Sequence, residues 1–246
     1  MIDIHCHILP EVDDGPKSWD AAVEMCRMAA SDGITHTVAT PHANDRYTYN
    51  REYLLGVLDQ LREKIGPAVP LQLSLGCDFH LSFENLELAL EQPHTYTIGE
   101  TYYLLIELSN YSVPARLSEC FTRLGDRGLT PILTHPERNP ILQQTPQRIV
   151  EWAEQGCLIQ VTGSALTGHW GERPESLARW LLDRSAVHIL ASDAHDTKRR
   201  IPNLSAARDV AERIVGASYA DALVEHNPGA IVKGMPIPYC PRPVLN

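Results

Sequence analysis

Residues 2–7, Ile-Asp-Ile-His-Cys-His, open the chain with an apolar run that ends in two histidines. The same pattern recurs at five later places: Thr-Pro-His ends at His42, Leu-Gly-Cys-Asp at Asp78, Leu-Ile-Glu at Glu107, Leu-Thr-His at His135 and Ser-Asp-Ala-His at His195. Side chains at the ends of parallel strands converge in space when those strands form one barrel. The pattern therefore predicts a multinuclear metal site of the kind found in metal-dependent hydrolases.

Apolar runs at 2–7, 34–40, 71–77, 103–108, 130–135, 158–162 and 187–192 predict seven strands. Segments of helical periodicity alternate with them at 18–32, 51–65, 114–127, 146–156, 174–184 and 204–216. Repeated strand–helix units favour an α/β barrel over an open sheet, because an open sheet gathers its site at one switch point. The length of 246 residues suits a single barrel domain over 1–246.

Composition excludes several classes of partner. The net charge of -10, from 21 basic and 31 acidic residues, argues against binding to nucleic acid. The six cysteines are dispersed without a Cys-x-x-Cys pair, which is typical of a protein in a reducing cytosol. Neither a cleaved signal nor an apolar stretch of about 20 residues is evident. We therefore expect a cytoplasmic protein without direct membrane insertion.

Two pairs of candidate ligands carry most of the metal prediction. His5 and His7 are two residues apart in a strand, so both imidazoles project from the same face. Asp193 and His195 repeat that spacing after the run that ends at Ala191. A single His-x-His is weak evidence, but two such pairs on the first and last strands would meet where the barrel closes.

Three further candidates, Asp78, Glu107 and His135, each follow a largely apolar run. Burying a charge costs several kcal/mol unless it is paired or bound to metal. Mixed nitrogen and oxygen ligands suit Mn²⁺, Fe²⁺ or Zn²⁺. Asp14 and His42 could supply a further ion, although Asp14 before Gly-Pro is equally compatible with a turn. The nine candidates predict two or three ions; His36, His80, His94, His169, His188 and His226 lack the pattern.

Two arginines are candidates for binding a phosphoryl group. Arg138 lies three residues beyond His135, and Arg200 lies five beyond His195. A guanidinium binds phosphate oxygens through a bidentate fork. The alternative is a solvated or salt-bridged loop arginine, and Arg199 is an equally basic neighbour. No Gly-x-Ser-x-Gly or Cys-x5-Arg pattern indicates a serine or cysteine nucleophile.

Taken together, these motifs resemble the PHP (polymerase and histidinol phosphatase) superfamily, in its bacterial tyrosine-protein phosphatase branch from capsule and exopolysaccharide loci. The resemblance runs in order through Met-Ile-Asp-Ile-His-Cys-His, Val-Asp-Asp-Gly-Pro, Thr-Pro-His, Leu-Ile-Glu-Leu, Thr-His-Pro-Glu-Arg and Ala-Ser-Asp-Ala-His. It implies a distorted, TIM-like (β/α)7 barrel and a manganese-dependent phosphoric monoester hydrolase that acts on phosphotyrosine.

The resemblance also implies how the ligands divide among three ions. His5, His7, Asp78 and Asp193 would hold the first ion; Asp78, Glu107 and His135 the second; Asp14, His42 and His195 the third. The family usually carries Glu at the bridging position, whereas this chain has the shorter Asp78. The bridging geometry, the metal identity and the occupancy therefore depend on that residue.

The expected mechanism is in-line attack on phosphorus by a hydroxide that bridges two ions. Arg138 and Arg200 would neutralise the phosphate oxygens, and either His42 or Asp14 could protonate the leaving oxygen. The resemblance implies that the substrate is the phosphorylated tail of a bacterial tyrosine autokinase controlling capsule or exopolysaccharide synthesis. The alternatives are a small-molecule phosphatase, for example one acting on histidinol phosphate, and a non-catalytic regulatory module.

Overall fold

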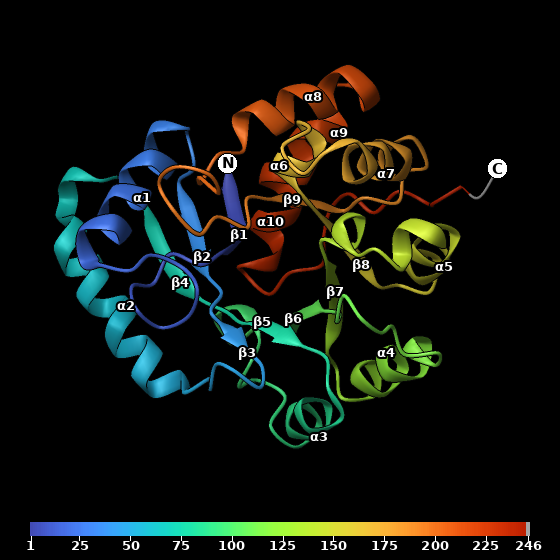
Figure 1. The fold of residues 1–246 in the computed structure, drawn as a ribbon, viewed down its shortest axis with the longest axis horizontal. Helices are drawn as coiled ribbons and strands as arrows, with labels where there is room; N and C mark the ends of the chain where they lie inside the picture. Colours follow the sequence, from blue (N-terminus) through green and yellow to red (C-terminus); the bar gives the residue numbers. More distant parts are fainter. Residues whose placement is uncertain (245–246) are drawn as a thin grey trace.

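The computed structural model describes residues 1–244 and contains two parallel β-sheets surrounded by helices. One sheet has the order β1-β2-β4 and the other β3-β5-β6-β7-β8-β9. The strands are β1 Ile2–Cys6, β2 His36–Ala39, β3 His42–Ala43, β4 Gln72–Leu75, β5 Asp78–His80, β6 Tyr103–Glu107, β7 Thr130–Thr134, β8 Leu158–Thr162 and β9 Ile189–Ala191. Figure 1 shows the strands in the interior and the helices around the outside.

The helices follow the strands along the chain. They are α1 Trp19–Ser31, α2 Arg51–Ile65, α3 Phe83–Glu91, α4 Leu117–Asp126, α5 Gln147–Glu154, α6 Gly163–Leu166, α7 Glu172–Asp183, α8 Ser205–Val215, α9 Ala217–Asp221 and α10 Asn227–Ile231. Short 3₁₀ turns span Gly66–Ala68, Ile98–Glu100, Pro136–Arg138 and Leu142–Gln144, and a π-helical turn spans Ala222–His226. Within residues 1–244, no helix is both long enough and apolar enough to cross a bilayer.

All seven predicted strands and all six predicted helices are present, but the prediction of one continuous barrel is not confirmed. The runs at 34–40 and 71–77 each break before their last residue, and the chain resumes as β3 and β5 in the second sheet. Pro41 contributes to the first break because it has no backbone N–H to donate to a ladder. The strands consequently form two sheets in which β3 and β5 carry the path of β2 and β4 onward.

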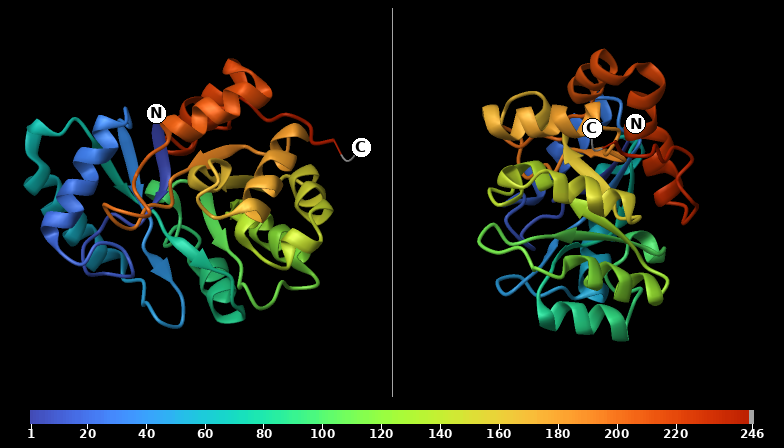
Figure 2. Two further views of the ribbon diagram at one scale, coloured as in Figure 1. Left: turned by 45° about the horizontal axis from the view of Figure 1, so that its top comes forward. Right: turned by 90° about the vertical axis from the view of Figure 1, so that its right-hand side faces the viewer.

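The first strand lies beside the end of the last one, as the two His/Asp-containing pairs predicted. The N–H of His7 donates to the carbonyl of Ala194 at 2.9 Å, and the N–H of Asp193 donates to the carbonyl of His5 at 2.8 Å. Figures 1 and 2 show β1 next to the C-terminal segments that include β9 and α10. These bonds bring ligand candidates from opposite ends of the chain to one place.

A shared apolar cluster fixes the strands beneath that place. Ile4, Val38, Leu105, Ile132 and Ile189 come from five strands of both sheets and are fully buried in one cluster. Burying such a side chain contributes roughly 1.5–3 kcal/mol to folding. This part of the interior is therefore packed with aliphatic groups, and the candidate ligands lie above it at the strand ends.

The surrounding helices show why the sequence pattern predicted them well. In α2, Asn50 accepts a hydrogen bond from the N–H of Tyr53 at the N-cap, and Leu54, Leu58 and Leu61 form the buried face at helical spacing. The cap and the apolar stripe together determine where the helix begins and which side it buries. The remaining helices lie around the sheets, and Figure 2 shows them from two further directions.

Candidate metal centre

All nine predicted ligands lie together at the carboxyl ends of the strands. Seven of them line a cavity of about 370 Å³ together with Arg138, Arg200 and Trp170: Asp14, His42, Asp78, Glu107, His135, Asp193 and His195. His5 and His7 are buried directly beneath, with imidazole Nε2 atoms 3.4 Å and 3.5 Å from Oδ1 of Asp193. Seven separate stretches of sequence thus contribute to one site.

The potential ligand atoms form four overlapping groups in which the atoms lie within 4.8 Å of one another. The groups are His5, His7 and Asp193; His5, Asp78 and His135; His42, Asp78 and Glu107; and His7, Asp14, His42 and His195. The first group contains three of the four residues expected for the first ion and lacks Asp78, and the last contains the three expected for the third ion together with His7. The expected second set is distributed over the two middle groups, and Asp78 belongs to both.

The donor atoms of these groups are buried and have no hydrogen-bond partner in the described part of the chain. They are Nε2 of His5, His7 and His195, Nδ1 of His42 and both carboxylate oxygens of Asp78. A buried polar atom without a partner costs about 1–3 kcal/mol, and more if it is charged. Six such atoms in one cluster are costly unless another group satisfies them. Divalent cations bound by these imidazoles and carboxylates would do so.

His7 is oriented by an aspartate that the sequence prediction did not include. Nδ1 of His7 donates to Oδ2 of Asp13 at 2.7 Å, which leaves Nε2 free to face the cavity. The other oxygen of Asp13 accepts from the N–H of Gly15 at 2.9 Å. A Cβ at Gly15 would lie 2.5 Å from the carbonyl oxygen of His7, so the loop requires glycine here. The Asp-Asp-Gly sequence therefore supplies both an orienting carboxylate, Asp13, and a ligand candidate, Asp14.

His5 and His195 are oriented in the same manner by other acceptors. Nδ1 of His5 donates to Oε1 of Gln160 on β8 at 2.8 Å, and Nδ1 of His195 donates to the carbonyl of Asp193 at 3.0 Å. An acceptor at Nδ1 fixes the proton there and directs the lone pair of Nε2 toward a metal. Three of the five imidazoles in the set are thus held in the tautomer that binds metal through Nε2.

The backbone is strained at two of the strand ends. His135 has φ 35° and Asp193 has φ 50°, and they are two of five non-glycine residues with positive φ in the described chain. Such conformations cost about 1–3 kcal/mol and persist where the surrounding structure imposes them. At both positions the unusual backbone conformation turns the side chain at the end of a strand toward the cavity.

The electrostatic environment gives the histidines of the site different pKa values. Burial opposes the charged form of His5, but the carboxylates of Asp78 and Asp193 outweigh it and raise the pKa of His5 to about 9. Burial and the nearby His195 ring lower the pKa of His7 to about 4. Burial also opposes charge at His42, yet Asp14 and Asp78 raise its pKa to about 11. The carboxylates therefore favour positive charge within the cavity.

The shorter Asp78 still reaches the centre of the site. Its Oδ2 lies 3.2 Å from Nδ1 of His42, 3.6 Å from Nε2 of His5 and 3.9 Å from Nε2 of His7. Burial raises its pKa, but the charges of His5 and His42 hold the pKa well below the ordinary range. Asp78 is a charged, buried carboxylate shared by two of the four ligand groups, which is the position that a bridging ligand requires.

Arg138 and Arg200 both line the cavity, and both form ion pairs with Asp193. Their guanidinium nitrogens lie 2.5 Å and 2.6 Å from the same oxygen, Oδ2. The indole of Trp170 covers them, with guanidinium carbons 4.4 Å and 5.4 Å from the ring centroid. Trp170 is itself anchored by a hydrogen bond from Nε1 to Oγ of Ser164 at 2.9 Å. The two arginines are therefore held in place and keep further N–H donors available.

Several residues of the site were absent from the sequence prediction. Asp13, Gln160 and Trp170 are described above, and Asn110 also lines the cavity. Asp3 is fully buried and accepts from the N–H of Ser192 at 3.0 Å, so it joins β1 to the segment after β9. The alternation of Asp3, His5 and His7 along one strand face was a signal that could have identified Asp3. His80, set aside as unpatterned, lies 3.4 Å from Glu107.

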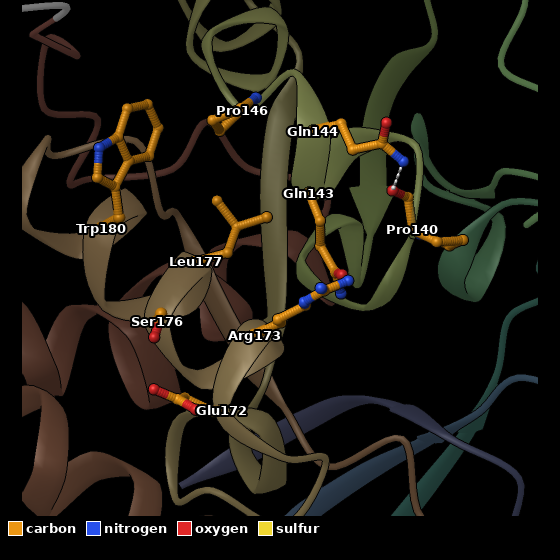
Figure 3. A pocket seen from close by; sticks show the side chains of 9 residues that line it. All are labelled: Pro140, Gln143, Gln144, Pro146, Glu172, Arg173, Ser176, Leu177 and Trp180. Carbon is orange, nitrogen blue, oxygen red and sulfur yellow. Dashed lines mark hydrogen bonds between the residues drawn. The ribbon is translucent and has the colours of Figure 1, made fainter.

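A larger cavity, of about 730 Å³, lies between α7 and the segment that follows β7 (Figure 3). Its walls carry Pro140, Gln143, Gln144, Pro146, Leu177 and Trp180, and its ionisable residues are Glu172 and Arg173. It holds no group of potential metal ligands. The chemistry of the molecule is therefore concentrated in the smaller cavity.

Comparison with known proteins gives the same assignment over nearly the whole chain. The family model for capsular polysaccharide synthesis, CpsB/CapC, matches residues 1–233. CapC of Staphylococcus aureus is 35% identical over 206 residues, covering 81% of this chain and 79% of the relative. Tyrosine-protein phosphatase YwqE of Bacillus subtilis is 32% identical over 228 residues, covering 92% and 89%.

The same relationship appears among solved structures. A crystal structure from a study of YwqE from Bacillus subtilis and CpsB from Streptococcus pneumoniae, described as metal-dependent tyrosine phosphatases, superimposes with a TM-score of 0.92. The match covers 100% of both chains at 32% identity. Dihydropyrimidinase from Brevibacillus agri has a TM-score of 0.56 at 10% identity, over 95% of this chain and 71% of its own. That second likeness concerns the fold alone.

Proposed function

The chain belongs to the CpsB/CapC family of capsular polysaccharide synthesis, and on this premise we propose that it is a metal-dependent protein-tyrosine phosphatase. The observation that carries this proposal is a set of buried imidazole and carboxylate atoms that have no hydrogen-bond partner within residues 1–244. They face one cavity together with two arginines. A phosphomonoester dianion would meet positive charge there, although the chain as a whole has a net charge of -10.

We propose that the nine clustered side chains hold two or three divalent ions, with manganese as the native metal. His5, His7 and Asp193 would hold one ion, His135 and Glu107 a second, and Asp14, His42 and His195 a third, with Asp78 between the first two. When bound, such ions activate water as a nucleophile at neutral pH and offset the charge of the phosphoryl group. Iron and zinc suit the same mixed ligand set.

The protein's own residues would orient the substrate. Arg138 and Arg200 would bind phosphate oxygens through the N–H groups that do not contact Asp193, and Asp193 keeps both guanidiniums aligned. Trp170 shields one side of the pair from water. Phenolate has a pKa of about 10 and leaves readily, so proton donation from His42 or Asp14 is a secondary role.

We further propose a physiological setting. The substrate would be the phosphorylated tail of a bacterial tyrosine autokinase in capsule or exopolysaccharide synthesis, and the enzyme would act in the cytoplasm. A flexible tail can reach a cavity at the rim of the strands more readily than a folded loop can. The family's link to capsular polysaccharide synthesis supports this setting.

For the fold, we propose that residues 1–246 form one domain in which the two sheets make a single distorted (β/α)7 barrel. The support is the bridge between Cys6 and Ala194, together with the apolar cluster that both sheets share. In this arrangement the ligands on β1 and those after β9 would lie on either side of the barrel closure.

Activity on matched substrates tests the proposed function. We expect His5→Ala and His135→Ala to lower phosphate release from a phosphotyrosine peptide by at least about 100-fold, whereas His226→Ala, an exposed histidine, retains it. A phosphoserine peptide and histidinol phosphate serve as comparison substrates. Faster turnover of histidinol phosphate would favour a small-molecule phosphatase, and no turnover with any divalent metal would favour a regulatory module.

A further inference from the structure

A second, smaller cavity lies directly beside the metal centre. It has a volume of about 240 Å³, and its lining includes Gly163, Ser164, His169, Lys198, Arg199 and Asn203. Lys198, Arg199 and His169 can carry positive charge, and none of the lining residues is acidic. The chain as a whole has a net charge of -10, so this cluster is a basic region on an acidic protein.

The two cavities share a wall. Trp170 lines the metal cavity, and its indole N–H donates to Ser164, which lines the basic cavity. Neighbouring residues also divide between the two: Arg200 lines the metal cavity and Arg199 the basic one. A peptide bound at the metal cavity would therefore reach the basic cavity by passing Trp170.

The loop that carries the cations is fixed before any ligand arrives. The carboxylate of Asp196 accepts from the N–H groups of Lys198 and Arg199, both at 2.6 Å. The N–H of His195 donates to the carbonyl of Arg200 at 2.8 Å and closes the loop. Preorganised backbone lowers the entropy lost on binding.

The floor of the basic cavity is equally well defined. A Cβ at Gly163 would lie 2.9 Å from Cβ of Ala207, so α6 and α8 approach as closely as glycine allows. Nδ2 of Asn203 donates to Asp32 at 2.6 Å, which holds the start of α8. Lys198 and Arg199 are exposed above this floor, and neither forms an ion pair with any residue of the described chain. Their charge is therefore available to a ligand.

We propose that this basic cavity is a subsite for the carboxylate of an Asp or Glu side chain that flanks the phosphotyrosine of the substrate. The proposal rests on the phosphatase function proposed above and adds a preference among phosphotyrosine sequences. Arg199 and Lys198 bind the carboxylate, and Ser164 is within the same lining to donate a hydroxyl hydrogen bond.

Two phosphotyrosine peptides that differ only in Glu or Gln within three residues of the phosphotyrosine test the subsite. For the wild type, kcat/KM should be about three- to tenfold higher for the Glu peptide, mainly through KM, because two exposed ion pairs contribute modestly. The preference should decline as salt is added. A wild type that does not distinguish the peptides would overturn the proposal.

Variants of Lys198 and Arg199 test whether these two residues cause the preference for the Glu peptide. Lys198→Ala/Arg199→Ala should abolish the preference for Glu, and Lys198→Glu/Arg199→Glu should reverse it toward a Lys-flanked peptide, which a folding defect cannot mimic. The matched control is Arg173→Ala, which removes an exposed arginine from the other cavity beside the site (Figure 3). Equal loss of preference in that control would indicate general electrostatic attraction and contradict the subsite.

The peptide assay distinguishes failure of the subsite from failure of the proposed phosphatase function. If the wild type hydrolyses both peptides at equal rates, the proposed function stands and the subsite fails. If it hydrolyses neither peptide, the proposed function fails and the subsite fails with it.

Discussion

Oδ2 of Asp78 lies 3.2 Å from Nδ1 of His42, and the two residues face each other as a register pair of β5 and β3. Both belong to buried groups of potential metal ligands, and neither of these two atoms has a hydrogen-bond partner in the described chain. The short side chain of Asp78 thus brings its carboxylate within ion-pair distance of the His42 ring. We therefore predict that the site is adapted to aspartate at position 78.

Lengthening this side chain should therefore impair the enzyme. Asp78→Glu inserts a methylene of about 1.5 Å between a fixed strand and His42, so we expect kcat to fall about tenfold and metal content to fall with it. Asp78→Asn keeps the length of the side chain and removes its charge, and it should lower kcat and metal content further. Phosphatase assays with metal analysis measure both effects, and an Asp78→Glu enzyme as active as the wild type would refute the adaptation.

The hydrogen bond from His7 to Asp13 should strengthen metal binding. Asp13→Asn weakens the acceptor at Nδ1 of His7, and we expect the affinity for Mn²⁺ to fall about 10- to 100-fold, as for other partners of metal-binding histidines. Asp126→Asn on the exposed surface of α4 is the matched control. Calorimetric titration of metal-free protein measures the affinity; unchanged affinity in Asp13→Asn would remove Asp13 from the site.

Arg138 should act on catalysis rather than on metal content. Arg138→Ala leaves Asp193 paired with Arg200, so the ligands should stay in place while kcat/KM falls about 100- to 1000-fold through loss of charge at the phosphate. Arg148→Ala removes an arginine that also stacks on a tryptophan, Trp152, away from the cavity. If Arg138→Ala loses metal and activity together, its role is structural.

The buried His188 should make the protein sensitive to acid. Its Nδ1 accepts from the N–H of Ile159 at 3.0 Å, and burial lowers its pKa to about 4. The unfolded ring has a pKa of about 6.5, so the unfolded state binds more protons between these values. The stabilisation is present above pH 6.5 and is lost as pH falls toward 4, by about 3 kcal/mol at most.

His188→Asn retains an acceptor for Ile159 without a titrating group. Denaturant unfolding should show that this variant loses less stability than the wild type between pH 6.5 and 4. His226→Asn, at an exposed position, should follow the wild type. Parallel pH profiles for wild type and His188→Asn would show that His188 does not contribute to acid unfolding.

The sequence predicted the clustering of the candidate ligands well because most of them follow an apolar run, and the strand length fixes where the side chain emerges. His5, Asp78 and His135 could be identified in this way, and all nine candidates lie in the cluster. Asp13 could not, because only the three-dimensional path of the loop decides which of two adjacent aspartates turns toward His7. The division into two sheets was missed for a related reason: a break at Pro41 looks in sequence like the end of a strand rather than a change of partner.

Gln160 and Trp170 illustrate a second limit. Gln160 lies in the middle of β8, where the sequence indicates only a buried strand, and its contact with His5 joins residues 155 positions apart. Trp170 follows a glycine and a histidine in a loop, and nothing local indicates that its ring covers Arg138 and Arg200. Long-range contacts of this kind depend on the tertiary structure.

The central claim, metal-dependent hydrolysis of phosphotyrosine, is tested most directly by phosphate release from a phosphotyrosine peptide before and after chelation. Protein stripped with EDTA should be inactive, and Mn²⁺ should restore activity in the wild type but not in His5→Ala. Vanadate should inhibit less than it inhibits a cysteine-dependent phosphatase. Full activity after complete removal of metal, or restored activity in His5→Ala, would contradict the account.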